Sequence, residues 1–238
     1  MTAPELWICD LPQVEYREAL DLQLRVRAAR QADEVPDTLL LLEHPRVYTR
    51  GRRSAPGELP LGEDFYREQG IDIVDVDRGG KLTYHGPGQL VGYPIMRITD
   101  VIAYLRTIEQ AIVATLAGAG LRSRARPDDG PDYTGVWVGD RKIASIGVHV
   151  ARGVTTHGFA INVHNDLAPF GWVVACGLDG VRMTSVRDEQ GEAGAASMTA
   201  TRASMAPRFA EAFGRRATEI SRPDLESALP ALAADRSA

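Results

Sequence analysis

Three apolar runs separated by short turns constrain the fold of this chain more than any other feature of its sequence. They span Tyr133 to Val138, Arg141 to Val150 and Thr155 to Val163, with turns at Gly139-Asp140 and at Arg152-Gly153. Glycine beside a polar residue in so short a connection is typical of a β-hairpin. Hairpins join antiparallel strands, so we predict a β-meander and exclude a purely parallel sheet.

Helical periodicity precedes the meander in two places. A helix is predicted from Glu15 to Arg30, and a second one after a cap at Thr99 or Asp100, with Gly118 and Gly120 at its end. The apolar positions of the two stripes are Ala19, Leu22, Val26 and Ala29, and Ile102, Leu105, Ile108, Ile112 and Leu116. Such stripes indicate helices packed on a core.

Further strands are expected from Asp37 to Glu43, from Ile71 to Asp77 and from Leu90 to Ile95. Alternation of apolar and acidic residues, interrupted at Ile73-Val74, predicts a half-buried strand from Ile71 to Asp77. A helical region is expected around Ala206 to Arg216. The predicted fold class is therefore α+β, with a mixed, largely antiparallel sheet and helices packed on it.

The length of 238 residues suits one domain, placed at residues 1–220, with a loosely packed C-terminal tail at 221–238. No apolar run approaches the ~18 residues of a membrane span, and no secretory leader is recognisable. The two cysteines, Cys9 and Cys176, are too few for a disulfide framework. We expect a cytoplasmic protein without a membrane partner, and the net charge of −5 disfavours a nucleic acid partner.

The run from Arg78 to Leu90, RGGKLTYHGPGQL, combines four glycines and a proline with an arginine, a tyrosine and a histidine. Repeated glycine is unfavourable in regular structure unless a close backbone approach requires it, so we interpret the run as a binding loop held between two strands. A tight turn without a ligand would explain Gly86-Pro87-Gly88 but not Arg78, Tyr84 or His85. Neither phosphate-loop motif is present there.

This run resembles the signature of the lipoate-protein ligase B family, octanoyltransferases that move an octanoyl group from acyl carrier protein to a lysine of a lipoyl domain. The resemblance covers most of the chain, from about Leu39 to about Ser185. It includes Glu43-His44-Pro45, Val47-Tyr48-Thr49 with Gly51-Arg52, Gly139 to Gly147, and Ala175-Cys176-Gly177. It implies the α+β architecture of the biotin and lipoate ligase catalytic domains.

By this resemblance the donor is octanoyl-acyl carrier protein, and the acceptors are the lipoyl domains of 2-oxoacid dehydrogenase E2 subunits and the glycine cleavage H protein. The reaction would be the first step of endogenous lipoate biosynthesis and would need no cofactor. Cys176 matches the nucleophile of the family, which forms an acyl thioester, whereas Cys9 lies outside the matched region. Without the resemblance, a cysteine after an apolar run is more often inert.

Lys142 is the expected partner of Cys176. Only Lys81 and Lys142 among the 27 basic residues are lysines, and a desolvated lysine can release a proton that arginine keeps. Regular alternation would place Lys142 on the apolar face of its strand, where it must be paired or become neutral. That face carries Ala144, Ile146, Val148 and Val150. The alternatives are a strand-end lysine that reaches water and a bulge near Gly147 that changes the phase.

The resemblance also implies the walls of a pocket for the acyl chain and the pantetheine end. They are Arg78, Gly79, Gly80, Lys81, Leu82, Thr83, Tyr84 and His85, then Ser145, Ile146 and Gly147, and Gly158, Phe159 and Ala160. Glycines beside apolar residues suit a narrow aliphatic slot. No metal site is implied, because the histidines and cysteines lack metal-binding spacing.

Arg50, Arg52 and Arg53 form the densest cationic patch of the chain. They would either dock the acidic carrier protein or lie in a solvated loop.

Three other functions stay open on sequence grounds. An ATP-dependent lipoate or biotin-type protein ligase would use a lysine and an acyl-adenylate but no cysteine nucleophile. A noncatalytic lipoyl-domain or acyl-binding module would need neither residue. A hydrolase could pair Cys176 with a histidine distant in the sequence. Cys176 and Lys142 together favour the transferase.

Overall fold

The computed structural model describes residues 2–55, 57–173, 181–191 and 198–230. Within these residues the largest element is a mixed sheet of nine strands in the order β12-β1-β2-β6-β10-β9-β8-β7, with β11 (Arg182–Met183) also paired to β9. β1 (Glu5–Gln13) is parallel to β2 (Asp37–Glu43) and to β12 (Arg216–Glu219). The pairs from β2 through β6 (Gln89–Ile95) to β7 (Arg124–Ala125) are antiparallel. The predicted α+β class with a mixed, largely antiparallel sheet is confirmed.

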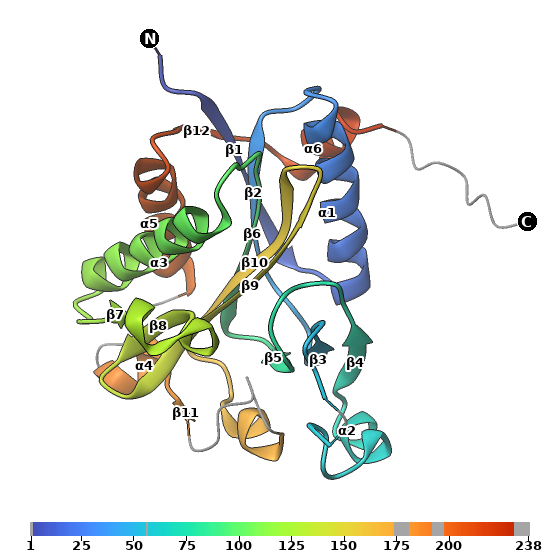
Figure 1. Ribbon diagram of the computed structural model, residues 1–238, viewed down its shortest axis with the longest axis vertical. Helices are drawn as coiled ribbons and strands as arrows, with labels where there is room; N and C mark the ends of the chain where they lie inside the picture. Colours follow the sequence, from blue (N-terminus) through green and yellow to red (C-terminus); the bar gives the residue numbers. More distant parts are fainter. Residues whose placement is uncertain (1, 56, 174–180, 192–197, 231–238) are drawn as a thin grey trace, which may run out of the picture.

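Helices cover both faces of this sheet (Figure 1). α3 (Val101–Gly118) and α5 (Met198–Ala212) pack on one face, and α1 (Tyr16–Gln31) and α6 (Arg222–Ser227) on the other. The leucines of β2 alternate between the two layers: Leu39 and Leu41 are buried with α3, and Leu40 and Leu42 with α1. A strand covered on both faces buries both sets of side chains, which explains the uninterrupted leucine run.

The predicted meander is confirmed as β8 (Gly135–Val138), β9 (Arg141–Ala151) and β10 (Val154–Asn162). Both hairpin turns contain a glycine with positive φ, +57° at Gly139 and +75° at Gly153, a conformation that other residues adopt at a cost. On its far side β10 pairs with β6. The meander is thus an extension of the central strands.

A second sheet of three strands follows the order β4-β3-β5. It consists of β3 (Val47–Arg50), β4 (Asp72–Asp75) and β5 (Thr83–His85), with α2 (Glu63–Glu68) before β4. We expected the entire glycine-rich run to be a loop, but its middle forms β5, with Tyr84 opposite Tyr48. Both tyrosines and Leu82 are buried in one apolar cluster, so the run has a core anchor of its own.

The sequence patterns missed the two strands β12 and β1 at one edge of the large sheet. β12 is short and mostly polar, and the register of β1 shifts between Asp10 and Gln13, so neither keeps a clear period of two. The C-terminal helix α5 begins at Met198 rather than near Ala206. A short helix, α4 (Val186–Gln190), follows β11.

Residues 221–230 belong to the fold, where we expected a loosely packed tail. The Ser221 hydroxyl accepts the backbone N–H of Asp224 at the start of α6. Leu225 and Leu229 are buried in the same cluster as β1 and α1. The expectation of a tail is wrong for this stretch, and its remainder, 231–238, lies outside the described residues.

α3 is long and apolar enough to cross a membrane, with 18 residues and a mean hydropathy of 1.2, a run that we did not expect. Its N-cap is Asp100, as predicted, whose carboxylate accepts the N–H groups of Ile102 and Ala103. Ile102 itself is 64% exposed and so does not belong to the buried stripe. Ile108, Ile112 and Leu116 are buried in the core shared with α5 and β8, as in a core helix, whereas Leu105 is half-buried.

We expect Leu225→Ala to destabilise the fold by about 2–4 kcal/mol, because it deletes a fully buried side chain and leaves a cavity. The measurement is the free energy of unfolding from urea titration. Leu61→Ala is the matched control, since Leu61 is 52% exposed and should cost little. Equal stability of the Leu225 variant and the native chain would show that α6 does not contribute to the stability of the fold.

Candidate active site

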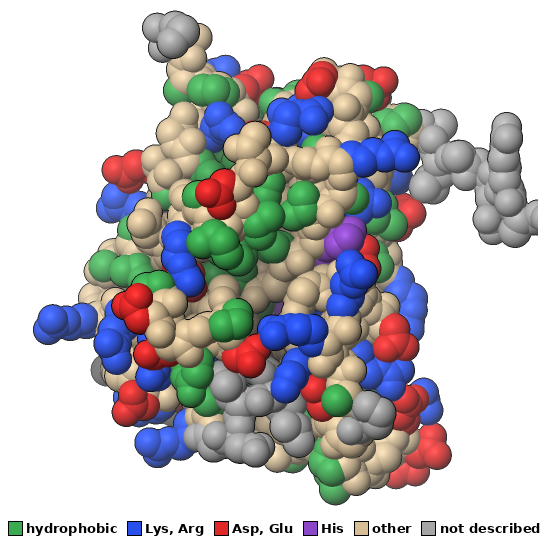
Figure 2. Space-filling view, viewed as in Figure 1, with side chains coloured by type: hydrophobic (Ala, Val, Ile, Leu, Met, Phe, Trp, Pro, Cys, Tyr) green, Lys and Arg blue, Asp and Glu red, His purple; other side chains and the backbone are tan. Residues whose placement is uncertain are grey.

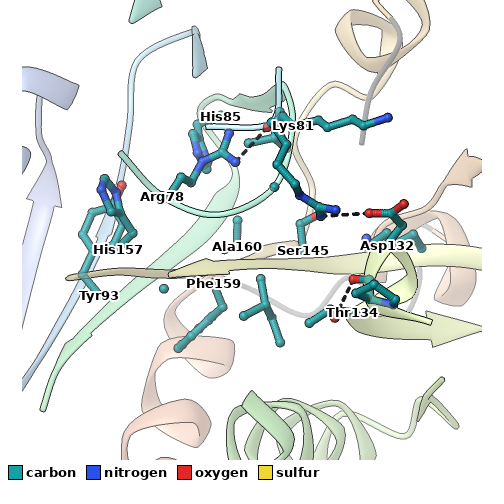
Figure 3. Close-up of a pocket in the computed structure, with 18 of the residues that line it drawn as sticks. Arg78, Lys81, His85, Tyr93, Asp132, Thr134, Ser145, His157, Phe159 and Ala160 are labelled. Atoms are coloured by element: carbon teal, nitrogen blue, oxygen red, sulfur yellow. Dashed lines mark hydrogen bonds and ion pairs between the residues drawn. The ribbon is translucent and has the colours of Figure 1, made fainter. Parts of the chain in front are cut away.

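A cavity opens between the meander and the glycine-rich run, on the α1 side of the sheet (Figure 3). Its empty space is about 650 Å³ with the open mouth included. Tyr93 and His157 lie at one end, and Asp132 and Thr134 at the other. The lining residues are Tyr16, Arg53, Arg78, Gly80, Lys81, Thr83, His85, Tyr93, Pro131, Asp132, Thr134, Lys142, Ser145, Ile146, Gly147, His157, Gly158, Phe159 and Ala160.

Two cross-strand pairs of small residues form the floor of the cavity. Gly147 of β9 lies opposite Gly158 of β10, and Ser145 lies opposite Ala160. A Cβ atom at Gly147 would come within 2.9 Å of the Gly79 carbonyl oxygen, so glycine is needed where the loop approaches the strand. The side chain of Phe159 instead packs in the core on the α3 side. A slot this narrow suits an extended aliphatic chain.

The roof is held by Arg78, whose guanidinium binds the protein's own backbone. It donates to the carbonyl oxygens of Lys81 (2.8 Å) and Gly79 (3.1 Å), and to both the carbonyl and the hydroxyl of Thr49 (2.7 Å each). Arg78 is 7% exposed. Its place in the fold is therefore that of a clamp that joins the run to β3.

Most of the residues predicted for the pocket line this one cavity, but three do not. Gly79 donates its N–H to the Val148 carbonyl oxygen of β9 (2.9 Å) and so supports the wall from behind. Leu82 and Tyr84 are buried in the cluster around Tyr48. The segment that the resemblance selected contributes to this cavity, and the strand alternation within β5 decides which of its side chains face it.

Lys142 lines the cavity, although regular alternation predicted the opposite face. Val136 pairs with Ala144 and Trp137 with Lys142, so β9 carries one extra residue, Ile143, at a bulge. Ile143 and Ala144 both enter the core, whereas Lys142 and Ser145 share the cavity. The change of phase occurs here and not near Gly147. Lys142 is 2% exposed, so its ammonium does not reach water along the strand end.

Sequence reasoning missed the polar end of the cavity. The Tyr93 hydroxyl and the His44 Nε2 atom are 2.7 Å apart, His157 Nε2 lies 2.7 Å from the Asp77 carboxylate, and the Tyr16 hydroxyl lies 3.4 Å from His157 Nδ1. His157 has a φ of +59°, a strained value for a histidine inside a strand. Tyr16, Tyr93 and His157 come from α1, β6 and β10, so no single motif marks them, whereas His44 lies in the Glu43-His44-Pro45 segment of the resemblance.

The histidines around the cavity are neutral near pH 7. Burial lowers the pKa of His44 to about 4 and that of His85 to about 3, and burial also lowers the pKa of His157. The hydrogen bond from His157 lowers the pKa of Asp77 to about 2. Among the described residues no group of three or more His, Cys, Asp or Glu side chains could hold a metal ion.

The structure describes only one of the two cysteines. Cys176 lies outside the described residues. Cys9 is fully buried on β1, and burial raises the pKa of its thiol to about 11, which makes it a poor nucleophile near neutral pH.

The cationic patch is partly neutralised within the protein. Arg50 forms ion pairs with Asp75 and with Glu63, both at 2.6 Å. Arg53 pairs with Asp132 across the mouth of the cavity at 2.8 Å, and Arg52 is exposed. Figure 2 shows Lys and Arg side chains interspersed with acidic ones over the face in view. Arg50, which is paired twice, is thus a structural cation, whereas the exposed Arg52 and the half-exposed Arg53, which is paired once, could contact a partner.

Comparison with known proteins decides the family. The sequence matches the lipoyl protein ligase A/B catalytic domain over residues 15–214. The chain belongs to this family. The octanoyltransferase of Solibacter usitatus is 48% identical over 172 residues, covering 71% of this chain and 76% of that protein. The octanoyltransferase of Acidobacterium capsulatum is 37% identical over 230 residues, covering 90% and 92%.

Solved structures of lipoate ligases share the fold. A lipoate-protein ligase A bound with ATP has a TM-score of 0.73 at 22% identity, covering 96% of this chain and 92% of its own. A bi-partite lipoate protein ligase from Thermoplasma acidophilum has a TM-score of 0.71 at 19% identity, covering 96% and 91%. At this identity the likeness concerns the fold alone.

Acidification should destabilise the folded chain through its buried neutral histidines. Between the ordinary pKa of 6.5 and the folded value of about 4, the unfolded chain binds a proton at His44 that the folded chain excludes. Stability is therefore complete above pH 6.5 and falls as the pH drops toward 4, by about 2 kcal/mol for this residue at pH 5.

The check is the urea midpoint at pH 7.5 and at pH 5 for the native chain and for His44→Asn. The variant should be less stable at pH 7.5 but should lose less on acidification. His164→Asn is the control, because the His164 side chain is exposed and should leave the difference unchanged. The same acid loss in the His44 variant as in the native chain would contradict the prediction.

Proposed function

We propose that this protein transfers an octanoyl group from octanoyl-acyl carrier protein to a lysine of a lipoyl domain, through an acyl thioester on Cys176 with Lys142 as its partner. The observation that carries the proposal is a buried lysine at a slot floored by Gly147, Gly158 and Ala160, in a chain 37–48% identical to proteins named octanoyltransferase. The slot supplies binding for an alkyl chain, and the lysine supplies the acid–base group.

The first half-reaction exchanges thioesters. The Cys176 sulfur attacks the carbonyl carbon of the donor, the bond from that carbon to the carrier's pantetheine sulfur breaks, and the leaving thiol takes up the proton given by Cys176. Lys142 as an ammonium would favour the attacking thiolate. Because one thioester replaces another, no nucleotide is needed.

The second half-reaction forms the amide. The ε-amine of the lipoyl-domain lysine attacks the acyl carbon, a C–N bond forms, and the bond to the Cys176 sulfur breaks. The amine loses a proton and the sulfur gains one, so a group that both accepts and donates a proton is required. Lys142 can serve in this way, whereas an arginine keeps its proton near neutral pH.

Two features support Cys176 over Cys9 as the nucleophile. Cys9 is buried on β1, and burial raises the pKa of its thiol, so it is a thiol and not a thiolate near neutral pH. β11, which follows Cys176 by a few residues, pairs Met183 with Lys142, so the chain that carries Cys176 returns to the strand of the lysine. In this proposal the reaction takes place in the cytoplasm, and Arg52 and Arg53 contact the acidic carrier protein.

The proposal predicts octanoyl transfer without ATP. Purified protein, octanoyl-carrier protein and a lipoyl domain should give octanoylated lipoyl domain, measured by intact mass. Without acceptor, peptide mapping should find the octanoyl group on Cys176, and Cys176→Ser should abolish transfer. Dependence on ATP would favour a ligase, and binding without transfer a noncatalytic module. Release of free octanoate as the main product would favour a hydrolase.

Exchange of Lys142 for arginine should separate the two half-reactions. Lys142→Arg keeps the positive charge, so acylation of Cys176 should remain measurable, but transfer to the lipoyl domain should fall at least about 100-fold, the usual contribution of a general base. Lys142→Ala should impair both steps. Single-turnover assays with isolated acyl-enzyme would measure each step, and Lys81→Arg is the control at the other lysine. Equal loss of both steps in the arginine variant would refute the proton-transfer role.

A further inference from the structure

Lys142 is held by an aromatic ring where a carboxylate would be the usual partner. We infer that Trp137 is the positioning residue of Lys142, holding its ammonium over the indole face without binding it as an ion pair. This inference rests on the proposed function, because it assumes that Lys142 exchanges protons during acyl transfer.

The geometry places the two side chains against each other. Trp137 on β8 is the register partner of Lys142 on β9, at the bulge. The Lys142 Nζ atom lies 5.3 Å from the centroid of the indole ring, within the range of a cation–π contact. Trp137 is fully buried and Lys142 is 2% exposed, so the contact is desolvated. Desolvation strengthens the attraction of a cation to the ring face.

The ring is itself fixed from behind. Its Nε1–H donates to the Tyr133 carbonyl oxygen at 3.0 Å, and its centroid lies 5.6 Å from that of the Tyr133 ring. The Arg126 guanidinium lies 4.9 Å from the centroid of each ring. The indole therefore cannot turn away from Lys142 without losing three contacts.

The lysine stem is fixed from the other side. A Cβ atom at Gly135 would come within 2.8 Å of the Lys142 Cε atom and 2.4 Å of the Ala144 carbonyl oxygen. The absence of a side chain at Gly135 thus makes the channel through which the stem passes. The Lys142 carbonyl oxygen accepts the N–H of Thr184 at 3.0 Å, which ties the backbone to β11.

The two carboxylates near this end of the cavity, Asp132 and Glu109, already have arginine partners. Asp132 pairs with Arg53 at 2.8 Å. Glu109 on α3 pairs with Arg106 at 2.6 Å and accepts the Gly135 N–H at 2.9 Å. Within the described residues no carboxylate lies within ion-pair distance of Lys142. Among the described residues, the electron-rich group that lies against the Lys142 ammonium is the indole ring of Trp137.

This arrangement suits a lysine that must exchange protons. A buried carboxylate would bind the ammonium as an ion pair and oppose its deprotonation. The ring quadrupole attracts the ammonium more weakly and packs equally well on the neutral amine, so the Nζ atom keeps its position in both states. The other charges that face Lys142 are Arg126 across the ring and Lys81, Arg53 and Asp132 in the cavity.

Only two lysines occur in the chain, which permits a direct test. With ¹³C-labelled lysine, the ε-CH₂ signals of Lys81 and Lys142 can be assigned by comparison with Lys81→Arg. The ring current of Trp137 should shift the Lys142 signal upfield. Trp137→Phe keeps an aromatic face and should keep most of this shift, whereas Trp137→Leu should abolish it. Thermal unfolding of both variants checks that they fold.

Transfer should follow the same order. In single-turnover assays we expect Trp137→Leu to slow transfer from the acyl-enzyme by about 10–30-fold, the loss expected for one desolvated cation–π contact. Trp137→Phe should stay within about threefold of the native rate, because a phenyl ring also attracts cations. KM for the lipoyl domain should not change, because Trp137 is fully buried.

Gly135→Ala gives an independent displacement in case Trp137→Leu fails to fold. The new Cβ atom would meet both the Ala144 carbonyl oxygen at 2.4 Å and the Lys142 Cε atom at 2.8 Å, so the strand must shift together with the lysine stem. The upfield shift and the transfer rate should therefore fall together, and thermal unfolding again checks the fold. Gly139→Ala is the control, since it also has positive φ but its Cβ atom would meet nothing within 4 Å.

The outcomes separate this inference from the proposed function. Equal activity of Trp137→Phe and Trp137→Leu, or an unshifted Lys142 signal in the native chain, would overturn the positioning role while transfer itself stands. Full transfer by Lys142→Ala would instead overturn the catalytic use of the lysine, even if the upfield shift shows that the ring contact exists.

Discussion

A single extra residue in β9 determines which face of the strand carries Lys142. Ile143 at the bulge lets the strand stay paired with both neighbours while its side chains change faces. Without the extra residue, Lys142 would enter the α3 side of the core together with Ala144, where a charge would have to be desolvated among apolar side chains. With it, the lysine reaches the cavity from inside a fully paired sheet. The site thus gains a cation on a strand that is paired with β8, β10 and β11.

The cavity combines a narrow floor of small residues with walls whose charged side chains are Arg53, Arg78, Lys81, Asp132 and Lys142. Glycine and alanine on β9 and β10 keep the floor flat, and Arg78 donates hydrogen bonds to the carbonyl oxygens of Lys81 in its own loop and Thr49 in β3. Burial keeps His44 and His85 neutral near pH 7. An uncharged alkyl chain can lie along the floor of small residues, because it needs no polar partner there. The polar end beyond Tyr93 is satisfied by its own hydrogen bonds.

The sequence predicted the regular parts of the fold and the segments of the site, but not the local geometry. The meander, α1, β2 and α3 follow from periodicity because each keeps one period over its length. β1, β12 and α6 do not, because their burial depends on partners distant in the chain. For the site, the resemblance selected the glycine-rich run and Lys142. The face on which Lys142 lies depends on a bulge, and no residue type in the sequence predicts that bulge. Asp132, Tyr16 and His157 line the same cavity only because of the tertiary fold.

The pairing of β1 with β12 has a consequence for how the chain folds. Glu5 lies opposite Arg216, so the strand made first is bordered by the strand made almost last. During synthesis β1 can pair with β2 early, but its outer edge has no partner until residues 216–219 leave the ribosome. Contacts so distant in sequence slow folding, because loop-closure entropy precedes any gain from the contact. Until then the outer edge of β1 is open to other nascent chains. Pairing with β12 therefore also protects β1 from aggregation.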